Sequence, residues 1–266
     1  MALYLGLLIF SFLITSILVV PFINFLYKLR FLRRQQTTKD FLGTRTKIFD
    51  RFHKHKVGTP VGGGWLLIAV VCLLYALIFP LITFAGVFIS KFYPVREELN
   101  ILFFTFISFG LLGLYDDIKK FFGFQKSGFF GLRLRHKFLI QWILAFTVGV
   151  LLYRNLGVDF INIPFLGVIK LGIWYIPLAA FVIVAFANAL NITDGLDGLA
   201  SGLLMICLFA LWILSSRALD TPLSVFLSLW IGALLAFLYF NIYPARIFLG
   251  DVGALAFGAT LGVVGL

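Results

Sequence analysis

Acidic side chains are scarce in this chain, where Asp and Glu together number 11 among 266 residues. The two cysteines are isolated in the sequence and indicate neither a disulfide framework nor a zinc site. Cys72 and Cys207 fall inside apolar stretches, so we predict that they are small core residues. A cleavable signal peptide would begin with a positively charged segment, and the first ten residues contain no Lys or Arg. We therefore expect the first apolar run to be a retained helix.

Long hydrophobic runs dominate the sequence, which is 62% hydrophobic with a mean hydropathy of +1.07. A bilayer span needs about 20 apolar residues, and only helices or closed barrels satisfy the backbone inside hydrocarbon. The alternation typical of a membrane barrel is absent. We predict one all-α polytopic membrane domain over residues 1–266. Its eight predicted spans are 3–27, 61–89, 99–115, 138–153, 173–189, 199–214, 222–240 and 252–266.

The last predicted span is short for a bilayer. Residues 252–266 would extend about 22 Å at a rise of 1.5 Å per residue, whereas the hydrocarbon core is about 30 Å thick. A chain end inside lipid would also bury a charged carboxylate. We therefore expect the sequence to be a fragment that lacks a C-terminal portion.

The distribution of Lys and Arg gives an orientation. The loops at 28–59, 116–137, 190–198 and 241–251 fall on one side and hold 17 of the 22 basic residues. The positive-inside rule makes this side cytoplasmic and places the N-terminus outside. The net charge of +11 is thereby explained by orientation and anionic lipid, and we expect no nucleic acid partner. In the longest external loop, residues 159–171 could form a short hairpin.

The same alternation places five aspartates at the cytoplasmic side, namely Asp116, Asp117, Asp194, Asp197 and Asp251. The orientation was assigned from Lys and Arg alone. That all five aspartates fall on one side is therefore independent support for a shared site. Acids at the edge of apolar spans are costly unless a cation gathers them. The sequence therefore predicts a metal-dependent site at one membrane face.

The first motif is Asp116-Asp117, followed by Lys119 and Lys120 at the end of the third span. Adjacent carboxylates at a helix C-terminus repel one another and oppose the helix dipole. One interpretation is a solvated helix end neutralised by the lysines. We favour the other, in which the acids bind a divalent metal or act as a base and a lysine meets phosphate.

The second motif lies between the fifth and sixth spans. Within residues 188–200 it contains Asn188, Asn191, Asp194-Gly195 and Asp197-Gly198. Asp-Gly pairs alone indicate turns, and Asp197 could cap the following helix. The density of polar groups favours a site for a polar ligand, which the glycines would allow to approach closely.

The third and fourth motifs flank other spans. Asp251 precedes the eighth span, where it could cap the helix or hold a metal while helix N–H groups face phosphate. Lys56 is followed by glycines at 62–64, which lack the Walker A spacing and could simply form a flexible helix start. His53 and His55 are weak metal candidates that are more typical of exposed loop residues.

Together these four segments, in this order and on this side, closely resemble the polyprenyl-phosphate N-acetylhexosamine-1-phosphate transferase superfamily. Within it, residues 56–64, 188–200 and 248–253 favour the bacterial phospho-N-acetylmuramoyl-pentapeptide transferase branch. The resemblance covers nearly the whole chain. One departure is Val61-Gly62, where the usual pattern has Thr-Met. Another is that the chain stops before the family's histidine-rich cytoplasmic loop.

The resemblance implies ten spans, external termini and a cytoplasmic Mg²⁺ site in the bacterial inner membrane. It implies UDP-MurNAc-pentapeptide and undecaprenyl phosphate as substrates and lipid I and UMP as products, and it leaves a homodimer open. It makes Asp251 the metal ligand and a catalytic residue beside the catalytic pair Asp116 and Asp117. The implied substrate-binding residues are Lys56, Lys120, Lys137, Asn188, Asn191, Asp194, Asp197, Asn241 and Phe248.

Two alternative functions stay open at this point. A sister transferase would move GlcNAc-1-phosphate or a related sugar phosphate to the same lipid. An ion-coupled transporter would place polar groups near mid-membrane, whereas these aspartates lie at one surface. For the transferase, we favour direct attack by the lipid phosphate over a covalent phospho-enzyme, because the acceptor oxygen is already a good nucleophile.

Overall fold

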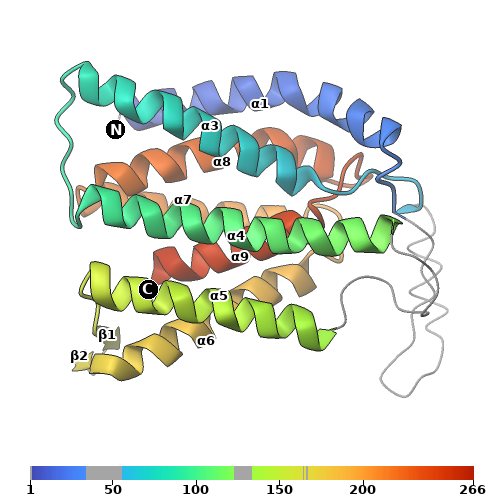
Figure 1. The fold of residues 1–266 in the computed structure, drawn as a ribbon. Coiled ribbons are helices and arrows are strands. Elements are labelled where there is room, and N and C mark those ends of the chain that lie inside the picture. The colour runs from blue at the N-terminus through green and yellow to red at the C-terminus, as the bar shows by residue number, and fades with distance from the viewer. Residues whose placement is uncertain (1, 34–55, 123–133, 164, 166) are drawn as a thin grey trace.

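The computed structural model describes residues 2–33, 56–122, 134–163, 165 and 167–266. In these residues the chain forms eight α-helices and one small hairpin (Figure 1). The helices are α1 (Ala2–Lys28), α3 (Gly63–Phe84), α4 (Val95–Phe122), α5 (Leu134–Asn155), α6 (Tyr175–Thr193), α7 (Leu199–Arg217), α8 (Thr221–Asn241) and α9 (Gly250–Gly265). Each of the eight predicted spans corresponds to one of these helices, so the predicted all-α class is confirmed.

Seven of the described helices, all except α9, are long and apolar enough to cross a membrane. They lie side by side, with their connections gathered at two opposite ends (Figure 1). Large apolar side chains on their outer faces are exposed, including Ile17 on α1, Leu77 on α3 and Ile206 on α7. This is a multi-pass membrane protein, because its helices are long and apolar enough to span a bilayer, which would cover such surfaces favourably.

The short helix α9 occupies the interior of the bundle instead of facing lipid. It packs against α3, α4, α6 and α7, and nearly all of its side chains are buried. Glycine makes this possible, because a Cβ on Gly64 would lie 2.2 Å from the Cα of Gly253, and one on Gly113 would lie 2.2 Å from the carbonyl oxygen of Asp251. Small residues let membrane helices approach this closely. An apolar sequence alone does not distinguish such a helix from one that faces lipid.

The hairpin predicted within residues 159–171 is also confirmed. Strands β1 (Phe160–Ile163) and β2 (Gly167–Lys170) pair antiparallel, with Phe160 opposite Lys170. A short 3-10 turn, Gly172–Trp174, then leads into α6.

Contacts between loops show which connections share an end of the bundle. At one end, Leu32 pairs with Pro60, and Val61 pairs with Phe248. At the other end, the backbone N–H of Thr221 donates to the carbonyl of Ser90, 3.2 Å away. These connections are grouped as the Lys and Arg distribution predicts. That the first end faces the cytoplasm stays a prediction.

Candidate active site

Two lysines and two aspartates form an ion-pair cluster where α4, α5 and α9 meet. Lys137 on α5 donates to Asp116 at 2.9 Å and also contacts Asp251. Lys120 on α4 lies 2.7 Å from Asp251 and 3.2 Å from Asp116. The Asp116 side chain is 4% exposed and that of Asp251 is 15% exposed, so Asp251 is the more open of the two. Each carboxylate therefore has both ammonium groups near it, which offsets the cost of burial.

Asp117 faces a different partner. Its Oδ2 accepts a hydrogen bond from the backbone N–H of Val252 at 3.1 Å, in the first turn of α9. The backbone N–H of Asp251 also donates to it. The carboxylate of Asp117 thus satisfies donors at a helix N-terminus, where negative charge is favoured. It holds the start of α9 against the end of α4.

This arrangement decides between the alternatives for Asp251. Leu249 is the N-cap residue of α9, and Asp251 lies in the first turn with its side chain directed to the two lysines. The capping explanation is therefore wrong for Asp251, and Asp117 supplies that function from another helix. The helix that carries Asp116 and Asp117 continues to Phe122, beyond the predicted end of the span at 115.

Among the residues that the structure describes, no three acidic, histidine or cysteine side chains form a preassembled metal cage. Mg²⁺ seldom needs one, since it is commonly held by one or two carboxylates together with waters and substrate phosphates. The oxygen donors of Asp251 and Asp116, lying side by side, fit that requirement. His53 and His55 lie outside the described residues.

A second cluster lies beside the first and is built from three loops. Lys56 pairs with Asp197 at 2.7 Å and donates to the carbonyl of Gly195 at 3.1 Å. Asp197 also accepts from the backbone N–H of Ala245 at 3.1 Å. The Lys56 ammonium lies 5.6 Å from the centre of the Phe248 ring. Lys56, Asp197 and Phe248 are thus brought together from segments far apart in the sequence.

Asp194 links the two clusters electrostatically. Burial, followed by repulsion from Asp251, raises the pKa of its carboxyl to about 7. The backbone N–H of Gly250 and the cations Arg33 and Lys56 oppose that rise. A buried carboxyl with a pKa near neutrality is typical of functional sites, although ion-pair networks produce the same effect.

Asn241 serves mainly to hold the site together. Its amide nitrogen donates to the carbonyl of Ile247 at 2.9 Å, and its Oδ1 accepts from the hydroxyl of Ser201. The side chain is almost completely buried. These bonds hold the loop that carries Phe248, so Asn241 helps to position the Phe248 side chain.

Asn188 lies deeper between α5 and α6. Its amide nitrogen donates to Gln141 at 2.6 Å and to the carbonyl of Val184 at 2.8 Å. Asn191 lies one turn further along α6 and is half-buried. Asn188 thus packs α6 against α5 through Gln141.

The glycines at 62–64 act in packing. The N–H groups of Gly62 and Gly63 donate to the carbonyl of Phe248 at 3.1 and 2.9 Å, and that of Gly64 donates to Leu249 at 2.9 Å. Donors that are used in this way are not available to cradle a phosphate. The glycine segment instead fixes the start of α3 against the start of α9.

Sequence reasoning missed Arg33 and Gln141. The Arg33 guanidinium lies 5.1 Å from the centre of the Phe248 ring. Arg33 belongs to a run of basic residues, and the positive-inside rule already accounts for their charge. Its backbone hydrogen bonds to Gly58 and Thr59, which the sequence does not show, distinguish it from the rest of the run. Gln141 lies one turn after Lys137 on α5, a spacing that could have drawn attention to it.

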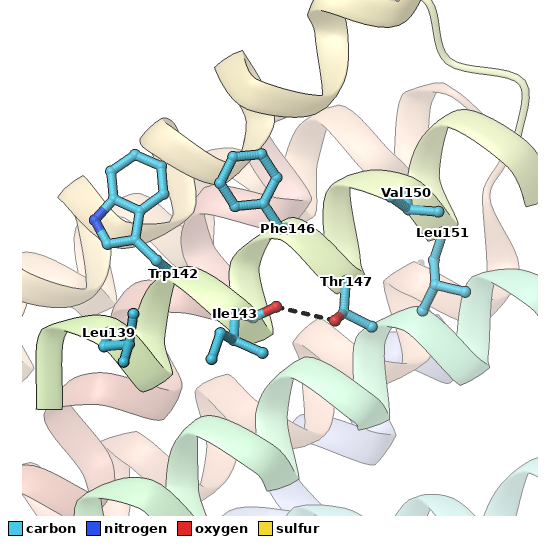
Figure 2. Close-up of a pocket in the computed structure, with 7 residues that line it drawn as sticks. All are labelled: Leu139, Trp142, Ile143, Phe146, Thr147, Val150 and Leu151. Carbon is cyan, nitrogen blue, oxygen red and sulfur yellow. Dashed lines mark hydrogen bonds between the residues drawn. The ribbon is translucent and has the colours of Figure 1, made fainter. Parts of the chain in front are cut away.

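The described part of the chain also has an apolar groove of about 610 Å³ along α5. Its lining residues are Leu139, Trp142, Ile143, Phe146, Thr147, Val150 and Leu151 (Figure 2). The Thr147 hydroxyl donates to the carbonyl of Ile143 at 2.9 Å, within the helix itself. No charged group lines this groove, so it is separate from the polar clusters.

The sequence of the chain matches a known protein family. The model of a family described as glycosyl transferase family 4 matches residues 99–266. The chain belongs to this family. The matched region contains most of α4 and all of α5 to α9, and therefore all four lysine and aspartate residues of the first cluster.

Several relatives are similar to most of the chain. A phospho-N-acetylmuramoyl-pentapeptide-transferase from Chloroflexus aurantiacus is 37% identical over 221 residues, or 80% of this chain. Proteins of the same name from Clostridium perfringens and Clostridium beijerinckii are 36% identical over 96% and 97% of it. The chain spans 56% of the length of the Chloroflexus relative and 71% and 72% of the Clostridium relatives.

Proposed function

We propose that this chain carries out, in its membrane, the transfer of phospho-MurNAc-pentapeptide from UDP-MurNAc-pentapeptide to undecaprenyl phosphate. The products are lipid I and UMP. The observation that carries the proposal is the cluster of Lys120 and Lys137 with Asp116 and Asp251 at one end of a membrane bundle. The names of the relatives support the choice of donor, and the apolar surroundings suit a lipid acceptor.

The reaction joins two anions, so charge must be neutralised where they meet. A phosphate oxygen of the lipid forms a bond to the sugar-linked phosphorus of the donor. The bond between that phosphorus and the oxygen bridging it to the other phosphorus breaks, and its electron pair leaves with UMP. Lys120 and Lys137 are placed to hold phosphate oxygens during this exchange.

The aspartates have distinct proposed tasks. Asp251 and Asp116 would provide oxygen ligands for Mg²⁺, and Asp117 would keep Asp251 in place through the start of α9. Bound Mg²⁺ would supply charge neutralisation on the diphosphate. Direct attack by the lipid phosphate is favoured over a phospho-enzyme, since every aspartate of the site is engaged by a lysine or a backbone N–H group.

The nucleotide end of the donor fits the second cluster. Phe248, which is buried in this structure with the Lys56 cation close to its ring, is the aromatic group on which a bound base would stack. We place this end of the bundle in the cytoplasm of a bacterium, because its loops carry most of the basic residues. The water-soluble donor would then arrive from the cytoplasm and the lipid from within the membrane.

The proposal is tested by measuring UMP release from purified protein in lipid nanodiscs. We expect release from UDP-MurNAc-pentapeptide only when undecaprenyl phosphate is present, with loss in EDTA and recovery on adding Mg²⁺. Release from UDP-GlcNAc in place of the muramoyl donor would indicate the sister transferase. Release from neither donor would rule out the proposed transfer.

A further inference from the structure

Arg33 is a cation beside the second cluster, close to the Phe248 ring. The reaction proposed above assigns it no role. It lies just after α1, and its backbone is paired with the segment that leads into α3. The Arg33 N–H donates to the carbonyl of Thr59 at 3.0 Å, and the Gly58 N–H donates to the carbonyl of Arg33 at 2.9 Å. These two bonds fix the direction in which the side chain leaves the backbone.

The side chain is held over an aromatic ring that is itself fixed. The guanidinium lies 5.1 Å from the centre of the Phe248 ring, which suits a cation–π contact. Phe248 donates its N–H to the carbonyl of Pro60 at 2.9 Å. Arg33 and Phe248 are therefore tied to the same short segment, and their relative position is set by backbone hydrogen bonds.

The guanidinium has no salt bridge or side-chain hydrogen bond to any residue that the structure describes. Burial lowers the pKa of Arg33, and the more distant carboxylates of Asp194 and Asp197 oppose that change. Arginine nonetheless stays charged in proteins. Lys56, by contrast, is already paired with Asp197 and Gly195. Within the described part of the chain, Arg33 is thus a cation held over Phe248 whose five N–H donors make no side-chain hydrogen bond.

The chemistry of this group indicates what it would bind. A planar guanidinium offers two parallel N–H donors that match the oxygens of a phosphate, and a lysine does not. Its neighbour Phe248 suits a base. Lys120 and Lys137 lie on the α4 and α5 side of Asp251, whereas Arg33 lies with the loops before α3 and α9. This separation favours the nucleotide over the lipid as the partner of Arg33.

We propose that Arg33 binds the phosphate that stays with the nucleoside, the one released in UMP. This inference rests on the proposed function, because it assigns a residue to the donor of that reaction. Arg33 would hold the phosphate while Phe248 holds the base, so the two would fix the leaving group. The lipid phosphate would be held by other residues.

The test compares UMP with uridine, which lacks the phosphate, as ligands of the protein in nanodiscs. Arg33→Met should weaken UMP binding about tenfold, as expected for loss of a charge-assisted bidentate contact, and leave uridine binding unchanged. Arg33→Lys should recover only part of the loss. The matched control is Arg30→Met, which removes the same charge from an exposed side chain three residues away.

Titration calorimetry or saturation-transfer NMR measures both ligands, and kinetics give the KM values. The proposal predicts a higher KM for the UDP-sugar and an unchanged KM for undecaprenyl phosphate. Equal loss of UMP and uridine binding would mean that Arg33 acts only through Phe248, and unchanged UMP binding would also overturn the proposal. Failure of the proposed function itself would be seen separately, as wild-type protein that neither binds UMP nor releases it.

Discussion

The Asp117 carboxylate on α4 accepts a hydrogen bond from the backbone N–H of Val252 on α9, 3.1 Å away. The residue next to Val252 is Asp251, whose side chain meets both lysines of the first cluster. One aspartate therefore fixes the backbone on which another is presented. Asp117 is therefore a supporting residue, whereas the side chain of Asp251 is in a position to contact the reactants.

Asp117→Ala should lower the stability of the protein and the rate of UMP release. Loss of a helix N-terminal acceptor costs about 0.5–2 kcal/mol, and the start of α9 would then be less well fixed. Asp117→Asn keeps an acceptor oxygen and should be milder in its effect on stability. The apparent melting temperature in detergent measures this difference. The control is Asp159→Ala in the segment just before β1, and an equal loss in both proteins would contradict the capping role.

Asp251→Asn should abolish transfer and leave insertion into the membrane intact. Removing a charge aimed at the reacting groups costs on the order of 10²–10³ in rate, and loss of a metal ligand adds to this. Binding of Mn²⁺, followed by electron paramagnetic resonance, should weaken in the same variant. Near-normal turnover with normal Mn²⁺ binding would remove Asp251 from the metal site.

The positions of the helices could be predicted because membrane spans and their loops have strong composition signals. The predicted span 222–240, for example, corresponds to α8 at Thr221–Asn241. The hairpin was predicted equally well from the apolar residues around its central turn. These features depend on residues that are close together in the sequence, so the sequence itself reports them.

The partners within the site could not be predicted in the same way. That Asp117 caps α9, and that Arg33 lies on Phe248, depends on contacts between segments more than 100 residues apart. The buried position of α9 depends on glycines that meet other helices, as Gly64 meets Gly253. A linear sequence contains the residue types that permit these contacts and does not state which residues pair.

Gly113→Ala should separate α4 from α9 and reduce activity. A Cβ at this position would lie 2.2 Å from the carbonyl oxygen of Asp251 and 2.6 Å from the Cα of Val252, both of which are backbone atoms. The added methyl group must push the start of α9 away, and overpacking of this kind typically costs about 1–3 kcal/mol. UMP release and the melting temperature should both fall.

The matched control for that variant is Gly202→Ala on α7, because a Cβ there meets nothing within 4 Å. Alanine favours helix more than glycine does, so Gly202→Ala should be neutral or slightly stabilising. If both variants behave alike, the close contact between α4 and α9 does not determine the position of Asp251.

Asp220 provides a prediction about pH at the opposite end of the bundle. It caps α8 by accepting from the backbone N–H of Leu223 at 3.3 Å, and burial raises the pKa of its carboxyl. The Leu223 N–H and a hydrogen bond with the Glu98 side chain oppose the rise, and Tyr93 is a further titratable neighbour. Above the ordinary carboxyl range near pH 4, the folded protein keeps a proton that the unfolded chain has released. Its free energy of unfolding should therefore fall as the pH rises through the interval up to the raised pKa.

Asp220→Asn should remove the part of this dependence that Asp220 contributes while keeping the cap, since Asn caps helices about as well as Asp. The melting temperature of the variant, relative to the unaltered protein, should increase with pH across that interval and then level off. The matched control is Asp159→Asn, which removes the same charge from the segment just before β1. A difference between Asp220→Asn and the unaltered protein that stays constant from pH 4 to pH 8 would mean that the Asp220 carboxyl keeps its ordinary pKa in the folded protein, and that its burial beside Glu98 is offset by the cap.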